Sequence, residues 1–366
     1  MKSYLKNQYE PSLDYVDLKT TFDNYFSDDV WLSEFKHTRE FEKQLSLLVG
    51  VKHTHMTNNG TVSLSLALLA AGIKPGDEVL VPDLTMVATY NAVKLIGAKP
   101  VLVDIEEDTL CMDLDKAVKH ITKNTKAFIY VSFNGRYSNI DKVMDFAYIH
   151  NLVFIEDAAQ ALSSRYSSKE YIGSLGDISS FSFSVPKIIT TGQGGCVMTN
   201  KDSLSINLKR LRDFGREQGG TNDHTYFGIN SKFTDMQALV GLSELKHIEN
   251  RSVKKKQIYS EYYYQLKDLF VEGTIKFIET DLRYTVPWFV DIYVENRIGL
   301  SNYLKHNDIA TRPIYTALHK LKYINKKGDF PVANYHGGRG LWLPCSLNIT
   351  TNEIKKVCDI IKEYYE

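Results

Sequence analysis

The chain has 366 residues, more than a typical single core needs and enough for two domains. Its 44 basic and 44 acidic side chains balance, so net charge gives no reason to expect nucleic acid or an anionic membrane as a partner. The opening stretch MKSYLKNQYEPSLDY lacks the apolar core of a signal peptide, and runs such as LALLAAG are too short to span a bilayer. We therefore expect a soluble, cytoplasmic protein. The widely spaced Cys111, Cys196, Cys345 and Cys358 favour buried, reduced thiols over a disulfide framework or a zinc site.

Short apolar, β-branched runs alternate with helix-length segments through the first part of the chain. This order predicts an α/β domain with a mainly parallel central sheet covered by helices. The predicted strands cover residues 78–83, 99–105, 126–133, 151–157, 178–184 and 195–200, and helix-length segments cover 61–71, 89–96 and 139–150.

A long helix is predicted near residues 235–268, because Thr234 and Gln237 form a capping-box pattern ahead of leucines at near-helical spacing. Strand-like and helix-like segments follow it to the C-terminus. We therefore expect a large domain over residues 1–250 and a smaller C-terminal α/β domain over residues 251–366, connected by this helix.

Three features of the large domain suggest chemistry. The first is TNNGTVSLSLALL, in which Gly60 and Thr61 stand at the start of a predicted helix. Free amides and the helix dipole favour an anion there, and the glycine allows its close approach. An ordinary helix cap with a turn glycine explains the same residues.

The second feature is FIEDAAQ, where an apolar strand ends at Asp157. Ligands bind beyond the carboxyl ends of parallel strands, so this carboxylate is well placed to meet one. A carboxylate that caps the next helix is an equal alternative.

The third feature is SFSVPKIITTGQGG, in which Lys187 follows a strand and precedes several glycines. A neutral lysine amine forms a Schiff base with an aldehyde, and a pyridine cofactor that uses this bond also needs an acidic partner and a phosphate site. Lys187, Asp157 and the helix start at Gly60 would supply all three. Taken alone, Lys187 is better explained as a solvated residue at a strand end.

Three other patterns do not indicate a functional site. His53 and His55 share one face of a predicted strand, but no third ligand is evident, and we expect no metal site. The tyrosine cluster on the predicted long helix is better explained by core and interface packing than by the stacking of nucleic-acid bases; it consists of Tyr262, Tyr263 and Tyr264. No G-x-G-x-x-G follows a predicted strand, which removes the usual nicotinamide fingerprint.

Longer motifs resemble one family over nearly the whole chain. They are REFEKQLSLLVGVKH, NNGTVSLSLALLAAGIKPGDEVLVP, FIEDAAQAL, IGSLGDISSFSFSVPKIITTGQGG, INSKFTDMQALVGLSEL and GLWLPCSLNIT. The chain thereby resembles the sugar-nucleotide aminotransferases of the DegT/StrS type, which are fold-type-I enzymes dependent on pyridoxal 5′-phosphate (PLP).

The resemblance implies a role for each matching residue. Lys187 would form the Schiff base, Asp157 would partner the pyridine nitrogen, and Gln160 would contact the ring hydroxyl. Asn230 in GINSKFTD would reach the phosphate of the neighbouring subunit, which implies a homodimer with shared active sites. The phosphate itself would be held by Gly60, Thr61 and Ser182.

Three positions depart from the family pattern and bear on substrate geometry. Met86 stands where many relatives stack an aromatic ring on the cofactor, so a sulfur contact would replace that stacking. Leu162 stands where histidine is common, and Gln193 stands where glutamate is usual.

The C-terminal segments PWFVDI, NDIATRPIYTALHK and FPVANYHGGRGLWLPCSLNIT resemble the branch that aminates C4 of nucleotide-linked 4-keto-6-deoxyhexoses, such as perosamine and viosamine synthases. Arg312 and His319 would then face the nucleotide-sugar substrate, although a surface arginine and a structural histidine are equal alternatives. Glutamate is the expected amino donor, and the product would serve surface polysaccharide synthesis. The alternatives are a C3 aminotransferase, a PLP-dependent sugar dehydratase, against which Lys187 counts, and a non-catalytic regulatory protein.

Overall fold

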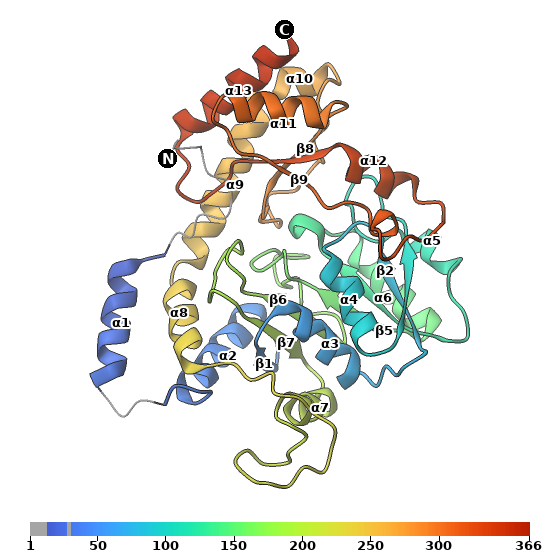
Figure 1. Cartoon of the computed structure of the whole chain (residues 1–366), viewed down its shortest axis with the longest axis vertical. Coiled ribbons are helices and arrows are strands. Elements are labelled where there is room, and N and C mark those ends of the chain that lie inside the picture. Colours follow the sequence, from blue (N-terminus) through green and yellow to red (C-terminus); the bar gives the residue numbers. More distant parts are fainter. Residues whose placement is uncertain (1–12, 28–30) are drawn as a thin grey trace.

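The computed structural model describes residues 13–27 and 31–366, which form a large lobe and a smaller lobe (Figure 1). Residues 1–12 lie outside the described part, and with them most of the segment on which the signal-peptide prediction depends. Among the described residues, no helix is both long and apolar enough to cross a membrane. The four cysteines are buried and free. The division of domains at residues 250 and 251 stays a prediction.

A seven-stranded sheet forms the centre of the large lobe, in the order β1-β7-β6-β5-β4-β2-β3. Only β7 runs against its neighbours β1 and β6, so the sheet is mainly parallel, as predicted. The strands are β1 (His53–Thr57), β2 (Glu78–Pro82), β3 (Lys99–Val103), β4 (Thr125–Val131), β5 (Val153–Asp157), β6 (Ile178–Ser182) and β7 (Gly195–Thr199).

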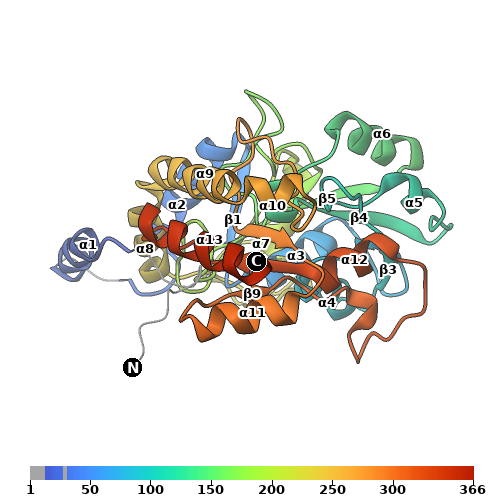
Figure 2. The same cartoon turned by 90° about the horizontal axis from the view of Figure 1, so that it is seen from above.

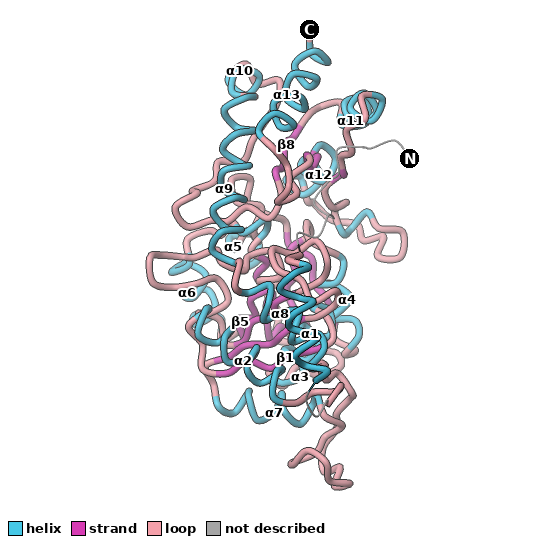
Figure 3. The backbone as a smooth tube through the Cα atoms, turned by 90° about the vertical axis from the view of Figure 1, so that its left-hand side faces the viewer, coloured by secondary structure: helices cyan, strands magenta, loops and turns pink. Residues whose placement is uncertain are grey.

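Both faces of the central part of this sheet are buried, which explains why β2, β4 and β5 consist mostly of apolar residues. In β4, Ala127 and Ile129 join one core cluster, whereas the alternating Phe128 and Tyr130 join another. Helices cover the sheet on its two sides (Figure 3). Those of the large lobe are α1 (Tyr15–Ser27), α2 (Lys36–Val49), α3 (Gly60–Ala70), α4 (Val87–Leu95), α5 (Leu114–Val118), α6 (Ile140–His150), α7 (Asp202–Arg212) and α8 (Asp235–Leu245), with the 3-10 turn η1 (Phe133–Gly135).

The smaller lobe contains a three-stranded antiparallel sheet in the order β8-β10-β9. Helices pack beside one another around it, α13 lying against both α9 and α11 (Figure 2). Its elements are α9 (Ile248–Gln265), α10 (Lys267–Val271), β8 (Val290–Tyr293), α11 (Arg297–His306), β9 (Arg312–Pro313), η2 (Leu318–Lys320), α12 (Pro331–Arg339), β10 (Gly340–Leu343) and α13 (Thr351–Tyr365).

The segment predicted as one long helix near 235–268 is two helices, α8 and α9. The Thr234 side chain caps α8 by accepting from the Gln237 amide, in agreement with the capping pattern. The backbone then tightens at His247, whose amide bonds to the carbonyl of Glu244 instead of continuing the α-helical pattern. A buried ion pair between Glu244 and Arg251, with N–O distances of 2.5 Å, bridges and fixes this bend.

A buried ion pair also fixes the two lobes relative to each other. Arg136, which follows η1, donates to both carboxylate oxygens of Asp291 in β8, at 2.8 and 2.6 Å. The same guanidinium donates to Thr280 at 2.9 Å. Breaking a buried pair of this kind leaves an uncompensated charge, at a cost of about 3–5 kcal/mol. The geometry between the lobes is therefore well defined.

Candidate active site

A cleft with a volume of about 600 Å³ lies where β5 and β6 end, between the two lobes. Strands of an α/β sheet present their carboxyl ends to ligands at such a place. The predicted site residues that line it are Gly60, Thr61, Met86, Asp157, Gln160, Ser182, Lys187 and Arg312.

The start of α3 forms one wall of the cleft. Asn59 caps the helix, because its side chain accepts from the Val62 amide at 2.9 Å and its carbonyl accepts from the Ser63 amide. The amides of Gly60 and Thr61 precede these bonds and lie at the positive end of the helix. A Cβ on Gly60 would stand 2.9 Å from the Cβ of Ser182, so glycine is needed for α3 and β6 to meet here. This corner is suited to an anion.

Asp157 lies at the bottom of the cleft, almost fully buried. One carboxylate oxygen accepts from the Thr89 hydroxyl at 2.8 Å, and the other accepts from the Ala159 amide at 3.2 Å. Burial raises the pKa of Asp157, while these two donors and Lys187 oppose the rise. No helix begins directly after Asp157, so the helix-cap alternative does not hold.

The side chain of Gln160 is oriented by the loop after β4. Its Oε1 accepts from the Asn134 amide at 2.9 Å. Asn134 in turn pairs with the backbone of Phe289, accepting from its amide and donating to its carbonyl. Since the oxygen of Gln160 is used in this way, its NH₂ group remains to donate into the cleft.

Lys187 stands in a turn after β6, where its amide bonds to the carbonyl of Ser184 at 3.0 Å. Its Nζ lies 3.5 Å from the ring centroid of Trp288. Burial lowers the pKa of Lys187 to about 7, although the negative charge of Asp157 works in the opposite direction. An amine with such a pKa is partly neutral near pH 7 and can act as a nucleophile or as a proton carrier.

The smaller lobe closes the cleft with Arg312, Tyr315 and Trp288. The Arg312 guanidinium lies 5.3 Å from the ring centroid of Trp342. Met86 is partly exposed at the start of α4 and faces the same space, as does Gln193. Leu162 lies behind Lys187, in the wall of a small adjoining cavity.

Two predicted site residues lie outside this lining. His319 is bonded to Asp83, with its Nδ1 2.5 Å from one carboxylate oxygen and its amide donating to the other at 2.9 Å. Its ring stacks on Phe330. Asn230 is exposed on the segment that follows α7, with a backbone bridge to Asp213. The substrate role of His319 and the intersubunit role of Asn230 stay predictions.

Sequence reasoning missed Thr89, Trp288 and Tyr315. Thr89 fixes Asp157, Trp288 covers Lys187, and Tyr315 lines the cleft from the smaller lobe. Their local patterns are those of ordinary helix and core residues. The packing of α4 beside β5 brings Thr89 to Asp157, and the packing of the smaller lobe on the larger one brings Trp288 and Tyr315 to the cleft.

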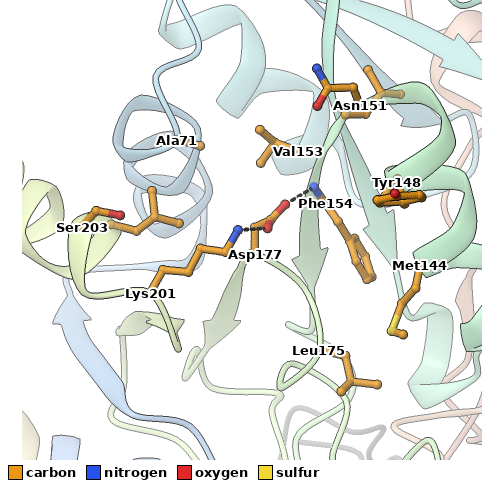
Figure 4. Close-up of a pocket in the computed structure, with 13 residues that line it drawn as sticks. Ala71, Met144, Tyr148, Asn151, Val153, Phe154, Leu175, Asp177, Lys201 and Ser203 are labelled. Atoms are coloured by element: carbon orange, nitrogen blue, oxygen red, sulfur yellow. Dashed lines mark hydrogen bonds and ion pairs between the residues drawn. The ribbon is translucent and has the colours of Figure 1, made fainter.

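A second cleft, of about 650 Å³, lies between α6, α7 and the end of α3 (Figure 4). Its acidic residue Asp177 is paired with Lys201 and also accepts from the Phe154 amide at 2.8 Å, so its charge is satisfied. His53 and His55 are bonded to Asp202 and Ser205. No group of His, Cys, Asp and Glu among residues 13–27 and 31–366 could hold a metal ion.

The first cleft therefore combines a partly neutral lysine, a buried carboxylate and an anion-binding helix start. PLP requires groups of these three kinds, for its aldehyde, its pyridine nitrogen and its phosphate, and the residues that line the cleft fit it. Fold and site together define the class of the protein: a PLP-dependent enzyme of the aminotransferase fold.

Comparisons with known proteins identify the family. The model of the DegT/DnrJ/EryC1/StrS aminotransferase family matches residues 19–362, and the chain belongs to this family. It is 32% identical to GDP-perosamine synthase of Vibrio cholerae, with 98% of each chain covered. It is 35% identical to GDP-perosamine synthase of Caulobacter vibrioides, covering 90% of this chain and 91% of that one.

A solved structure of a related protein has the same fold. The structure of NtdA from Bacillus subtilis with bound cofactor PMP has a TM-score of 0.89 and 26% identity, covering 97% of this chain and 83% of that one. The predicted fold class, the PLP cofactor and the sugar-nucleotide aminotransferase activity are confirmed.

Proposed function

We propose that the enzyme transfers an amino group from glutamate to C4 of a GDP-linked 4-keto-6-deoxyhexose, giving the 4-amino-4,6-dideoxyhexose. The observation that carries the proposal is the full-length similarity to two GDP-perosamine synthases, combined with a cleft that contains the lysine, carboxylate and anion partners of PLP. Such a product would enter surface polysaccharides. We also propose a cytoplasmic location, which the four free, buried cysteines support.

The cofactor would be held at three points. The start of α3 with Gly60 and Thr61, together with Ser182, would bind the phosphate, and the NH₂ group of Gln160 would donate to the ring hydroxyl. Asp157 would keep the pyridine nitrogen protonated. When bound, PLP supplies an electron sink for the charge left by the departing proton.

Lys187 would hold the cofactor covalently and then carry the proton. Once released, its Nζ can take a proton from the carbon that bears the donor nitrogen and return one to the carbon on the other side of that nitrogen, as base and then acid. The low pKa of its amine, about 7, suits both directions near neutral pH. Burial in the cleft keeps water from competing for that proton.

A homodimer with shared sites would complete the phosphate pocket. Asn230 is exposed and absent from the cleft of its own chain, as a residue that reaches a partner would be. Phe227 and Ile229 beside it expose apolar surface, with 70% and 40% of each residue accessible. Surface of this kind is suited to a two-fold interface.

The substrate proposal is tested with purified enzyme, glutamate and a panel of GDP-, UDP- and dTDP-linked 4-keto- and 3-keto-6-deoxyhexoses, with the product structure determined by NMR. We expect amination at C4 and the highest kcat/KM with the GDP-linked sugar. Amination only of 3-keto sugars, or a preference for another nucleotide, would contradict the proposal.

A further inference from the structure

The turn that carries Lys187 is fixed by donors on both of its sides. The indole Nε1 of Trp288 donates to the carbonyl of Pro186 at 2.6 Å, just before the lysine. Arg251 of α9 donates to the carbonyl of Ile188 at 2.9 Å, just after it. Both donors come from outside the β6–β7 segment, so elements distant in sequence decide where the lysine points.

Trp288 has a second contact with the lysine itself, because its ring lies under Nζ at 3.5 Å from the centroid. The ring is firmly placed. It is 6% exposed and stacks on Phe289 with centroids 3.8 Å apart. Its backbone carbonyl accepts from the buried ammonium of Lys255 at 3.1 Å, and Lys255 also donates to the carbonyl of Cys345 at 2.8 Å.

An aromatic face at this distance attracts an ammonium group, and the attraction grows as water is removed. The side chains that share the walls around Lys187 and carry charge or titrate are Asp157, Arg312, Tyr315 and Lys255. Asp157 is the negative one among them, and it is also the expected partner of the pyridine nitrogen. A released lysine ammonium therefore needs another support, and the Trp288 ring offers it.

We propose that Trp288 is a positioning residue for the transamination: its ring face holds the ammonium of Lys187 whenever the lysine is not bonded to the cofactor, and its N–H fixes the lysine turn. The inference rests on the proposed role of Lys187. It gives Trp288 two separable functions, one through the π face and one through the N–H.

The π face is tested in the enzyme loaded with pyridoxamine phosphate, in which Lys187 is free. The pKa of Lys187 is measured by trace acetylation across a pH series, with peptide mass spectrometry. In Trp288→Leu the apolar filling remains but the π face is lost, so the pKa should fall by about 0.7 of a unit, a fivefold change in the ratio of amine to ammonium. In Trp288→Phe it should stay near the wild-type value. An unchanged or raised pKa in Trp288→Leu would overturn this function.

The N–H is tested by amide hydrogen exchange of the peptide around residues 184–191 in the same loaded enzyme. Trp288→Phe keeps an aromatic face and removes the N–H that bonds to Pro186, and we expect exchange in this peptide to become several-fold faster. Phe146→Leu is the matched control, because it removes an equally buried ring from the core cluster on the other face of the sheet. Unchanged exchange in Trp288→Phe, or the same increase in the control, would refute the second function.

The assignment of Lys187 is checked separately by borohydride reduction of the PLP form, followed by peptide mapping. A label on another lysine would remove the basis of the proposed function and of this inference together. A label on Lys187 with no response to the Trp288 variants would contradict the inference alone.

Discussion

Replacing Asp157 by asparagine isolates the charge at the bottom of the cleft. The variant amide can keep the fold, because its oxygen can accept from the Ala159 amide while its NH₂ faces the Thr89 hydroxyl. Thr89 can turn its own hydrogen to Thr85, whose hydroxyl lies 3.2 Å away. The change therefore removes one negative charge with little rearrangement of its neighbours.

The expected loss of rate follows from that charge. Two opposite charges about 4 Å apart at an effective dielectric constant of about 20 attract by about 4 kcal/mol. If Asp157 holds the protonated pyridine nitrogen, its loss should slow the glutamate half-reaction by about a thousandfold, within the range for removal of a stabilising group from a buried site. The conversion of the cofactor is followed by absorbance in a single turnover.

Glu156→Gln is the control for this experiment. Glu156 is the neighbouring buried carboxylate, but it points to the other face of β5 and accepts from Tyr166 at 2.6 Å and Gly173 at 2.7 Å. This variant should lose thermal stability and keep its rate per folded enzyme. A rate within threefold of wild type for Asp157→Asn, or an equal loss in the control, would refute the assignment of Asp157.

Three further outcomes are expected. Gly60→Ala brings a Cβ to 2.9 Å from that of Ser182, so the start of α3 must move away from β6. Equilibrium dialysis should then show at least tenfold weaker cofactor retention. Normal retention would mean that the phosphate binds elsewhere. Mixing inactive Lys187→Ala and Asn230→Ala under subunit exchange should restore about half the wild-type activity per heterodimer, because one shared site then carries neither lesion. Asn222→Ala, from the same exposed segment, is the control and should be active without mixing. If the mixture of Lys187→Ala and Asn230→Ala recovers no activity despite verified subunit exchange, each site is built within one chain. Burial lowers the pKa of Lys187 to about 7. The glutamate half-reaction should therefore slow as pH falls below about 7, because the protonated amine cannot accept a proton. A rate independent of pH from 6 to 8 would contradict this expectation.

The sequence by itself determined the sheet and most of the cleft. The strands β2, β4 and β5 are buried on both faces, so mostly apolar runs mark them, and the carboxyl ends of the parallel strands β5 and β6 must lie at one edge of the sheet. Asp157, Ser182 and Lys187 were therefore predictable from local sequence order together with the family motifs, and the structure brings them into one cleft.

Only the tertiary structure decided which residues of the smaller lobe reach the cleft and where the long helical segment breaks. Trp288 and Tyr315 reach the cleft because the smaller lobe is fixed against the larger one through Arg136 and Asp291, a contact across 155 residues that no local pattern encodes. The break between α8 and α9 likewise follows from a buried ion pair that forms once the chain has folded. Local periodicity records which faces are buried, whereas the direction of a single side chain depends on the elements that pack against it.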